Sequence, residues 1–222
     1  MNTFFRDLTY TYFIKLVEKN DFIEIVQQDH KQILREEVNS KTLQITLTED
    51  FYRYQNRVCF DYSRVILPVE KRYGNYINAN YVNGYEYDKK YICTQAPLKH
   101  TCYDFWRMGW MNDTQIIVML CQKIEDKKEK CYAYWRDTEG SAVEFNKFTI
   151  TTTKIEYYAS YVKTTLLMTD GTSASQEITH FGFTQWPDFG TPTDTEDFLN
   201  FMLAVRQNQE EVIKQLIHCG QT

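Results

Sequence analysis

Two short segments carry residue types that could perform nucleophilic and acid–base chemistry. His218-Cys219 places a thiol near the end of the 222-residue sequence, and Trp186-Pro187-Asp188 places a carboxyl group beside a proline. A cysteine attacks only as its thiolate, so it needs a positive environment to ionise at neutral pH. A carboxylic acid can donate a proton to a leaving group. Either segment could also be ordinary structure, because most unassisted cysteines are inert and Pro and Asp are common in turns.

The elements that must position these segments predict a single α/β domain, with helices on both sides of a central sheet. Helical spacing predicts helices over 4–16, 22–33 (capped by Asn20 or Asp21) and 103–110, and one that begins near Asp194, where Thr193 and Glu196 have capping-box spacing. The runs that favour strands are 91–95, 116–120, 131–135, 145–152, 161–169 and 177–184, with an Asp170-Gly171 turn before the last. Residues 210–217 could extend the last helix, or Leu216-Ile217-His218 could form a short strand.

Composition excludes several classes of protein. The net charge is −5, whereas a nucleic-acid binder normally carries a basic surplus, so we expect no nucleic-acid partner. The six cysteines show no two-residue spacing, which argues against a zinc or redox motif, and we expect neither metal nor cofactor. The start of the chain lacks the apolar core of a signal peptide, and no apolar run is long enough to span a membrane. These features favour a reducing, cytoplasmic location with free thiols.

Seven blocks, in order along nearly the whole chain, resemble the non-receptor-like protein-tyrosine-phosphatase domain. They are Arg53 to Arg64 (RYQNRVCFDYSR), Tyr76 to Asn80 (YINAN), Tyr91 to Pro97 (YICTQAP), Phe105 to Met108 (FWRM), Ile117 to Leu120 (IVML), Lys130 to Trp135 (KCYAYW) and Trp186 to Pro192 (WPDFGTP). The N-terminal region and the Cys-Phe-Asp-Tyr-Ser-Arg block look most like the copies carried by bracoviruses of parasitoid wasps. The resemblance implies one phosphatase-like domain over 1–222, in which helices flank a central mixed, twisted sheet. It has N-terminal helices at 1–38 and recognisable blocks over 51–219.

The resemblance also implies roles for particular residues. In the family a cysteine thiolate attacks phosphorus, a loop of backbone amides with an arginine holds the phosphate, and an aspartate protonates the leaving tyrosine. Cys219 then has the nucleophile position, and Asp188 the general-acid position, with Trp186 at the hinge of its loop. Tyr54 would stack on the phosphotyrosine ring; the alternative is a core aromatic. Lys130, with Glu125, resembles the loop beside the acid loop, or forms an exposed charge cluster.

Two departures from the family pattern stand out. Asn56 replaces the usual aspartate that holds the peptide backbone, and an uncharged acceptor predicts weaker peptide binding. The family pattern is His-Cys, five further residues and then Arg. In this sequence, His218-Cys219 is followed only by Gly220-Gln221-Thr222. We therefore expect a domain truncated at the phosphate-binding loop, without the arginine and without the later helices that cover one face of the sheet. An uncovered face predicts an exposed apolar patch with one of three outcomes: a partner covers it, the protein self-associates, or the fold is only marginally stable.

The sequence therefore favours a catalytically inactive, phosphatase-like protein that binds phosphotyrosine-containing or signalling proteins. The bracovirus resemblance implies that it acts in the host cell cytoplasm, on host signalling and immune suppression. The alternatives are an active tyrosine phosphatase, if the missing arginine loop is supplied, and a degenerate copy without function. Turnover of an aryl phosphate would identify an active phosphatase, and a cooperative unfolding transition counts against a degenerate copy.

Overall fold

The computed structural model describes residues 10–35, 51–53, 59–85, 87–125, 127–187, 190–192, 194–208 and 215–219. It divides the chain into two compact units, Met1–Ser40 and Lys41–Thr222, where the sequence showed no boundary. The first unit holds α1 (Tyr10–Val17) and α2 (Phe22–Arg35). Both predicted N-terminal helices are thus present, although the predicted residues 4–9 lie outside the described part. The Asp21 carbonyl accepts the first helical hydrogen bond of α2, from the amide of Ile25 (3.0 Å).

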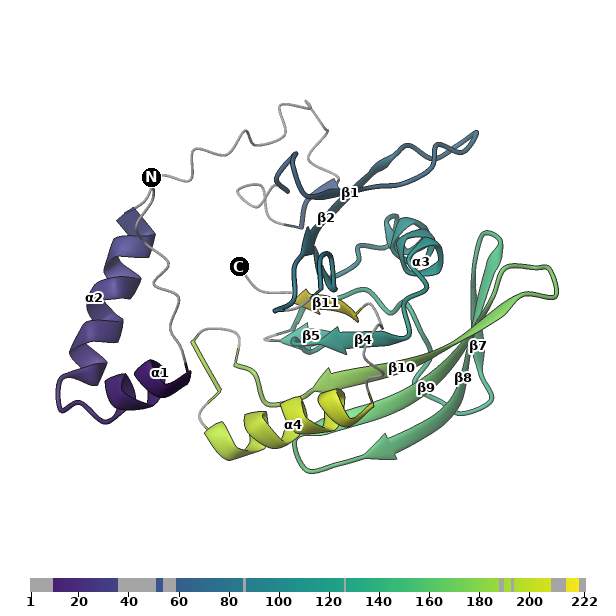
Figure 1. The fold of residues 1–222 in the computed structure, drawn as a ribbon. Helices are drawn as coiled ribbons and strands as arrows, with labels where there is room; N and C mark the ends of the chain where they lie inside the picture. The colour runs from purple at the N-terminus through teal and green to yellow at the C-terminus, as the bar shows by residue number, and fades with distance from the viewer. Residues whose placement is uncertain are drawn as a thin grey trace. The chain divides into compact units, whose positions relative to one another are not determined.

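The second unit is built on a mixed sheet that, within the described residues, has nine strands (Figure 1). Their spatial order is β1-β2-β3-β11-β4-β10-β9-β8-β7. Their bounds are β1 Arg64–Ile66, β2 Tyr76–Val82, β3 Tyr91–Gln95, β4 Ile116–Met119, β7 Ala142–Phe145, β8 Phe148–Tyr157, β9 Tyr161–Thr169, β10 Ser175–Phe183 and β11 Gln215–Cys219. A separate hairpin pairs β5 (Ile124–Glu125) with β6 (Lys128–Glu129). The predicted α/β class with a central mixed sheet is confirmed.

The centre of this sheet is parallel, because β11 pairs with both β3 and β4, and β4 pairs with β10. All four residues of β4, Ile-Ile-Val-Met, are buried, which is the pattern of a strand covered on both faces. Residues 215–217 of the ambiguous segment 210–217 therefore belong to a strand, β11, while residues 210–214 lie outside the described part. The insertion of β11 between two apolar strands explains the choice, since a strand there completes both hydrogen-bonded ladders.

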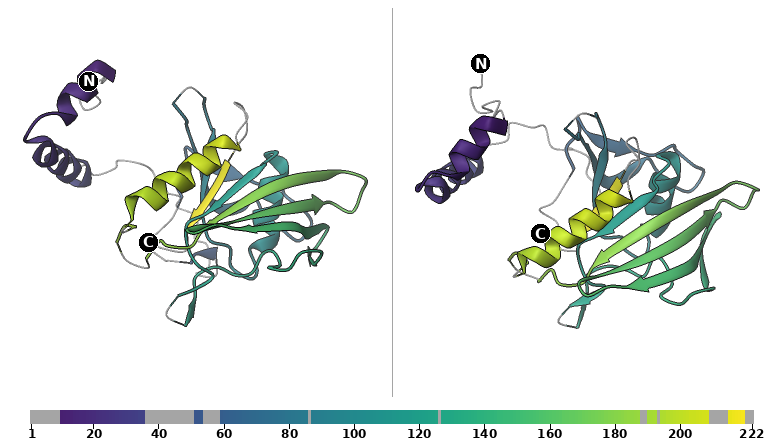
Figure 2. Two further views of the ribbon diagram at one scale, coloured as in Figure 1. Left: turned by 90° about the horizontal axis from the view of Figure 1, so that it is seen from below. Right: turned by 60° about the horizontal axis from the view of Figure 1, so that its bottom comes forward.

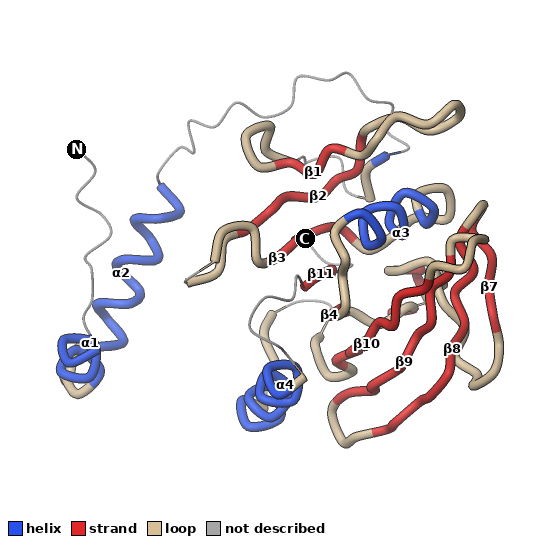
Figure 3. Tube along the Cα trace, turned by 45° about the vertical axis from the view of Figure 1, so that its right-hand side comes forward, coloured by secondary structure: helices blue, strands red, loops and turns tan. Residues whose placement is uncertain are grey.

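Helices α3 (Cys102–Met111) and α4 (Thr195–Gln207) cover opposite faces of the sheet (Figure 3). On one face, Phe105 and Trp106 of α3 pack with Ile117 of β4 in the larger core. On the other, Phe201 and Val205 of α4 pack with alternate strand residues in a smaller core. Figure 2 shows α4 running across the central strands when they are seen from below. Strand alternation thus divides β4 between two cores.

The start of α4 corrects the predicted cap. Asp194 is the N-cap residue, and its Oδ1 accepts hydrogen bonds from the amides of Glu196 (2.9 Å) and Asp197 (3.1 Å). The prediction paired Thr193 with Glu196 as a capping box, but Thr193 lies outside the described residues. A short carboxylate is as good a cap as a hydroxyl, and here it occupies the position next to the first helical residue.

The predicted strand over 131–135 is wrong, because that segment is irregular. Its backbone amides bond outside any ladder: the amide of Tyr132 donates to the carbonyl of Pro97 (3.0 Å), and that of Cys131 to Lys123 (3.3 Å). Tyr134 is nevertheless fully buried. The short apolar run Cys-Tyr-Ala-Tyr-Trp therefore resembled a strand in a segment that is fixed by side-chain packing.

The remaining strands form an antiparallel meander, and two turns account for its register. The single strand predicted over 145–152 is in fact β7 and β8, joined at Asn146-Lys147, where Asn146 has φ +54°. Between β9 and β10, Gly171 has φ +81°, and Oδ1 of Asp170 accepts from the amide of Thr172 (3.0 Å). Asparagine and glycine tolerate this left-handed conformation, which makes the tight turns.

Candidate functional site

The candidate site lies where the parallel strands β3, β11 and β4 end. Cys219 is the last residue of β11 and pairs in register with Gln95, the last residue of β3. The Cys219 carbonyl accepts from the amide of Ala96 (2.9 Å), and the His218 carbonyl accepts from the amide of Leu120 (3.0 Å). Ligands of α/β sheets commonly bind beyond the carboxyl ends of parallel strands. The predicted nucleophile position therefore falls at the edge where a ligand site is expected.

Cys219 contacts a carbonyl oxygen, which does not favour its thiolate. The side chain is half-buried against the larger core, and its Sγ donates a weak hydrogen bond to the Leu120 carbonyl oxygen, 3.9 Å away. A carbonyl oxygen is the negative end of a dipole, so this contact stabilises the thiol rather than the anion.

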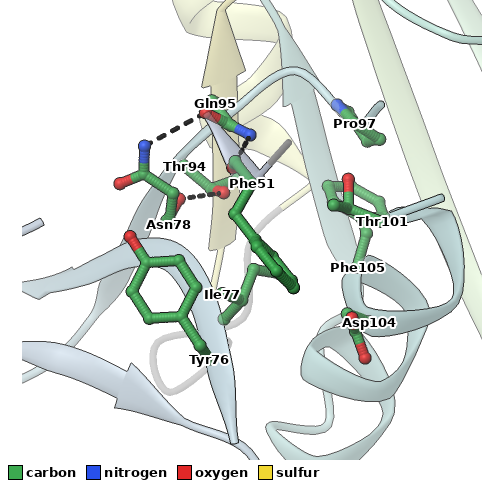
Figure 4. A pocket seen from close by; sticks show the side chains of 10 residues that line it. All are labelled: Phe51, Tyr76, Ile77, Asn78, Thr94, Gln95, Pro97, Thr101, Asp104 and Phe105. Atoms are coloured by element: carbon green, nitrogen blue, oxygen red, sulfur yellow. Dashed lines mark hydrogen bonds between the residues drawn. The ribbon is translucent and has the colours of Figure 1, made fainter. Parts of the chain in front are cut away.

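Gln95 connects the Cys219 end of the sheet to the segment that leads into Tyr54 (Figure 4). Its Oε1 accepts from the amide of Arg53 (3.0 Å) and from Nδ2 of Asn78 (3.0 Å), and its Nε2 donates to the carbonyl of Phe51 (3.1 Å). Gln95, Asn78 and Phe51 border a cavity of about 10 Å³, which is lined also by Asp104 and Phe105 of α3. That volume suits a water molecule at most. The cavity is thus part of the support of the site and too small for a substrate group.

Arg53 binds two other parts of the site together. Its Nε and Nη2 donate to the carbonyls of Ala96 (3.1 Å) and Pro97 (2.8 Å), and its Nη1 donates to the carbonyl of Glu129 (3.1 Å). Only a planar guanidinium can direct several donors in fixed directions at once. Arg53, the residue before Tyr54, is thereby held against Glu129, the residue before Lys130.

A buried hydrogen-bonded triad lies beneath Cys219. The hydroxyl of Tyr134 is 2.6 Å from Nε2 of His218 and 2.7 Å from Nε2 of His180. All three side chains are almost completely buried. A hydroxyl donates one hydrogen bond and accepts others, so one imidazole carries its proton on Nε2 and the other accepts there. Burial, followed by the nearby His218 and Lys123, lowers the pKa of His180 well below its ordinary value of 6.5, which keeps that ring neutral.

The thiols near the triad are poor nucleophiles. A hydrogen bond with Cys131, followed by burial, raises the pKa of the Cys121 thiol. Burial raises the pKa of Cys102 to about 12. Both groups therefore stay protonated at neutral pH and behave as small core residues.

The other predicted site residues fall into two groups. Lys130 is half-buried directly after β6, and its amide donates to the Lys123 carbonyl (2.9 Å). The ring of Trp186 packs edge-on against Phe198 of α4 (centroids 5.5 Å apart), and its Nε1 donates to the Gly190 carbonyl (3.3 Å). Tyr54, Asn56 and Asp188 lie outside the described residues, so their roles stay predictions.

The sequence analysis gave no role to Arg53, Gln95, Tyr134 or His180. The first three stand inside blocks that were recognised, and that was the only signal available for them. Within the described residues, no group of His, Cys, Asp and Glu side chains could hold a metal ion. No helix in the same part of the chain is long and apolar enough to cross a membrane.

Comparisons with known proteins agree with this geometry. The family model described as Protein-tyrosine phosphatase matches residues 48–221. Tyrosine phosphatase H2 of Microplitis demolitor bracovirus is 55% identical over 214 residues, which cover 96% of this chain and 66% of that protein. Tyrosine phosphatase-like protein J1 of the same virus is 38% identical over 198 residues, covering 87% of this chain and 66% of J1. The chain thus spans slightly less than two thirds of each relative.

Among solved structures, PTPN18 in complex with HER2-pY1196 phosphopeptides matches 96% of this chain and 78% of that chain. The TM-score is 0.84 at 25% sequence identity. The similarity therefore extends from local blocks to the arrangement of the whole sheet.

Proposed function

The chain belongs to the protein-tyrosine phosphatase family, and from that premise we propose that these 222 residues bind phosphotyrosine-containing signalling proteins without hydrolysing the phosphate. The observation that carries the proposal is the contrast between two parts of one site. Arg53, the residue before Tyr54, is held by well-formed hydrogen bonds to Gln95 and Pro97. The thiol of Cys219, at the nucleophile position, instead contacts a carbonyl oxygen.

Support for binding comes from the Arg53 and Gln95 contacts. They hold the residues before Tyr54 at the strand ends, where a phosphotyrosine ring would enter the site. The structurally similar PTPN18 was solved with phosphopeptides. In this proposal Tyr54 stacks on the ring, Asn56 accepts a hydrogen bond from the peptide, and Lys130 and Trp186 flank the site.

Support for the absence of hydrolysis comes from the chemistry of Cys219. Attack on a phosphate dianion needs a thiolate and groups that neutralise the charge on the equatorial oxygens. The described contact of the Cys219 thiol is with the Leu120 carbonyl oxygen, which is not a group that stabilises an anion. Asp188 could still protonate a leaving group, so an arginine loop supplied from elsewhere would give the alternative, an active phosphatase.

The setting follows from the bracovirus relatives. We propose that the protein acts in the cytoplasm of infected host cells and shields phosphotyrosine sites there. Occupying such sites would suppress the host immune signals that depend on them, because a bound site is closed to other binding domains and to phosphatases.

Binding is tested by fluorescence anisotropy with one peptide in its phosphorylated and unphosphorylated forms. We expect the phosphorylated form to bind more tightly, and Tyr54→Ala to remove most of the difference. Tyr157→Ala is the matched control, since Tyr157 is 76% exposed and lies on β8. Equal affinity for the two peptide forms would exclude phosphotyrosine recognition.

Hydrolysis is tested separately with an aryl phosphate and the 222-residue polypeptide. We expect no turnover above buffer, and no difference between the parent and Cys219→Ser. Turnover that disappears in Cys219→Ser would instead establish the active phosphatase. A thermal scan distinguishes both from a degenerate copy, which would show no cooperative unfolding.

A further inference from the structure

One row of residues across the sheet has a gap at a glycine. Gly182 of β10 pairs in register with Met119 of β4 on one side and with Val162 of β9 on the other. Val162 in turn pairs with Tyr157 of β8, so the row crosses four neighbouring strands (Figure 1). The other three residues carry large side chains, and the glycine carries none. The row is therefore open at its centre.

A pocket of about 480 Å³ lies over this gap. Gly182, Met119 and Val162 all line it, as does His180, which lies two positions before Gly182 and thus on the same face of β10. The segment between β4 and β7 contributes Trp135, whose ring packs against that of His180 (centroids 4.2 Å apart). The volume falls within the range of small-molecule sites.

The pocket lies on the face of the sheet opposite to α4. Met119 belongs to the larger core, which contains α3, whereas Val118 packs with α4 in the smaller core. Phe181 and Phe183, the neighbours of Gly182 on β10, also belong to the smaller core. Because strand residues alternate between faces, Gly182 faces the α3 side. All the lining residues come from the stretch between the end of β4 and the residue after β10.

Close backbone contacts do not account for the glycine. A Cβ atom added at Gly182 would lie 3.7 Å from Cε1 of His180 and 3.9 Å from the Val162 carbonyl oxygen, which are ordinary van der Waals distances. Glycine inside a strand lowers stability and often marks a place where a ligand approaches the backbone closely. The space that Gly182 leaves in the pocket therefore gives this residue a role.

The charged and amide side chains that line the pocket are bonded to other groups of the protein. Nζ of Lys123 donates to Oδ1 (2.5 Å) and Oδ2 (2.6 Å) of Asp137, and it lies 3.8 Å from the centre of the Trp135 ring. Nε2 of Gln122 donates to the Thr184 carbonyl (3.0 Å). A charged ligand group would have to displace one of these partners or remain unpaired, and an unpaired buried charge is costly.

The remaining walls add apolar surface and no net charge. Nε2 of His180 is 2.7 Å from the hydroxyl of Tyr134, and burial lowers the pKa of His180 well below 6.5, so its ring is neutral. Ile155 and Val162 supply aliphatic groups, and Trp135 supplies an aromatic ring. An uncharged ligand that carries an aromatic ring matches this lining.

We propose that this pocket binds an uncharged aromatic small molecule, whose ring lies over Gly182 between Met119 and Val162 and contacts Trp135. The site is distinct from the predicted nucleophile position, since Cys219 does not line it. The inference does not rest on phosphotyrosine binding.

Two fluorescent probes that share one ring system test the proposed chemistry. N-phenylnaphthylamine is uncharged, and anilinonaphthalene sulfonate carries one sulfonate on the same rings. We expect the 222-residue chain to bind the uncharged probe, and the sulfonate to weaken binding at least about tenfold, because its charge has no partner in the pocket. Failure to bind the uncharged probe, or equal affinity for the two probes, overturns the proposal.

A substitution at the glycine tests the location. Gly182→Val fills the gap and should weaken binding of N-phenylnaphthylamine at least about tenfold. Glu177→Val introduces the same side chain at an exposed position of the same strand and should leave the affinity unchanged. The melting temperature of each variant shows whether it is folded. Unchanged affinity in folded Gly182→Val would exclude this pocket as the binding site.

Methyl NMR of the unsubstituted protein locates the probe even if Gly182→Val fails to fold. Addition of N-phenylnaphthylamine should shift the methyl resonances of Met119, Ile155 and Val162, which line the pocket. Met202, which is exposed on α4, reports on the opposite face of the sheet. Shifts at Met202 without shifts at Met119 and Val162 would place the probe on the α4 face and contradict the proposal.

Discussion

The hydroxyl of Tyr134 lies 2.6 Å from Nε2 of His218, the residue directly before Cys219. The two residues are 84 positions apart in the sequence, and Tyr134 belongs to an irregular segment rather than to the sheet. The same hydroxyl reaches His180 on β10, so one buried oxygen connects β11 to β10 across β4. The hydrogen bond between Tyr134 and His218 therefore stabilises the end of β11, the strand that carries Cys219, inside an aromatic core.

Replacing that hydroxyl should be costly. Tyr134→Phe keeps the ring but leaves the Nε2 atoms of His180 and His218 without their bridging oxygen. We expect the free energy of unfolding to fall by about 1–3 kcal/mol, the usual cost of leaving buried polar groups unpaired. Urea denaturation measures the change. Tyr157→Phe, which alters an exposed ring, should change stability by less than about 0.5 kcal/mol, and an equal loss in the two variants would contradict the assignment.

His180 should make stability depend on pH. Burial depresses its pKa in the folded state below the ordinary value of 6.5, so the unfolded chain binds more protons as pH falls through 6.5. The stabilisation is therefore complete above 6.5 and is lost as pH decreases towards the folded pKa, by up to about 1.4 kcal/mol per pH unit.

Denaturation curves at pH 5, 6 and 7 test this dependence. His180→Gln can still bond to Tyr134 but does not titrate in this range, so its free energy of unfolding should fall less between pH 7 and pH 5. Carboxylates contribute equally to both proteins, and the difference in slope isolates the imidazole. Parallel slopes would mean that His180 binds protons equally in the folded and unfolded states, so that its pKa is not depressed by folding.

The Arg53 guanidinium should not be replaceable by an ammonium. Arg53→Lys keeps the charge but cannot reach Ala96, Pro97 and Glu129 together, so carbonyl groups from two segments lose their donor. We expect a loss of about 1–3 kcal/mol in stability and faster amide hydrogen exchange over 127–130. Arg72→Lys, at an exposed turn, serves as the control. Unchanged exchange in the Arg53 variant would show that the contacts do not hold the hairpin.

The cap of α4 should contribute measurably to stability. Asp194→Ala removes the acceptor for the amides of Glu196 and Asp197, and we expect a loss of about 1 kcal/mol. Asp194→Asn retains an oxygen acceptor and should recover most of the loss. Thermal unfolding compares the variants, with Asp88→Ala in an exposed turn as the control for removing a carboxylate.

Local chemistry in the sequence was sufficient to predict much of the fold. The apolar run of β4 required a strand buried on both faces, and Asp170-Gly171 required a tight turn because glycine accepts a positive φ without strain. Where two local readings competed, the sequence was insufficient. Residues 131–135 have the apolar run of a short strand but form their backbone hydrogen bonds elsewhere. The segment predicted as one strand over 145–152 contains the turn between β7 and β8 at Asn146.

The resemblance to the family identified Cys219 as a candidate site residue, but only the tertiary structure determined which residues contact that end of the sheet. Gln95 meets Cys219 because β3 and β11 end in register, and Tyr134 joins His180 to His218 because three distant segments converge under the sheet. Neither contact leaves a local pattern, because each hydrogen bond depends on the path of the chain between its partners. The residue types alone fixed which groups could donate or accept, while the packing of the sheet and its helices chose the pairs.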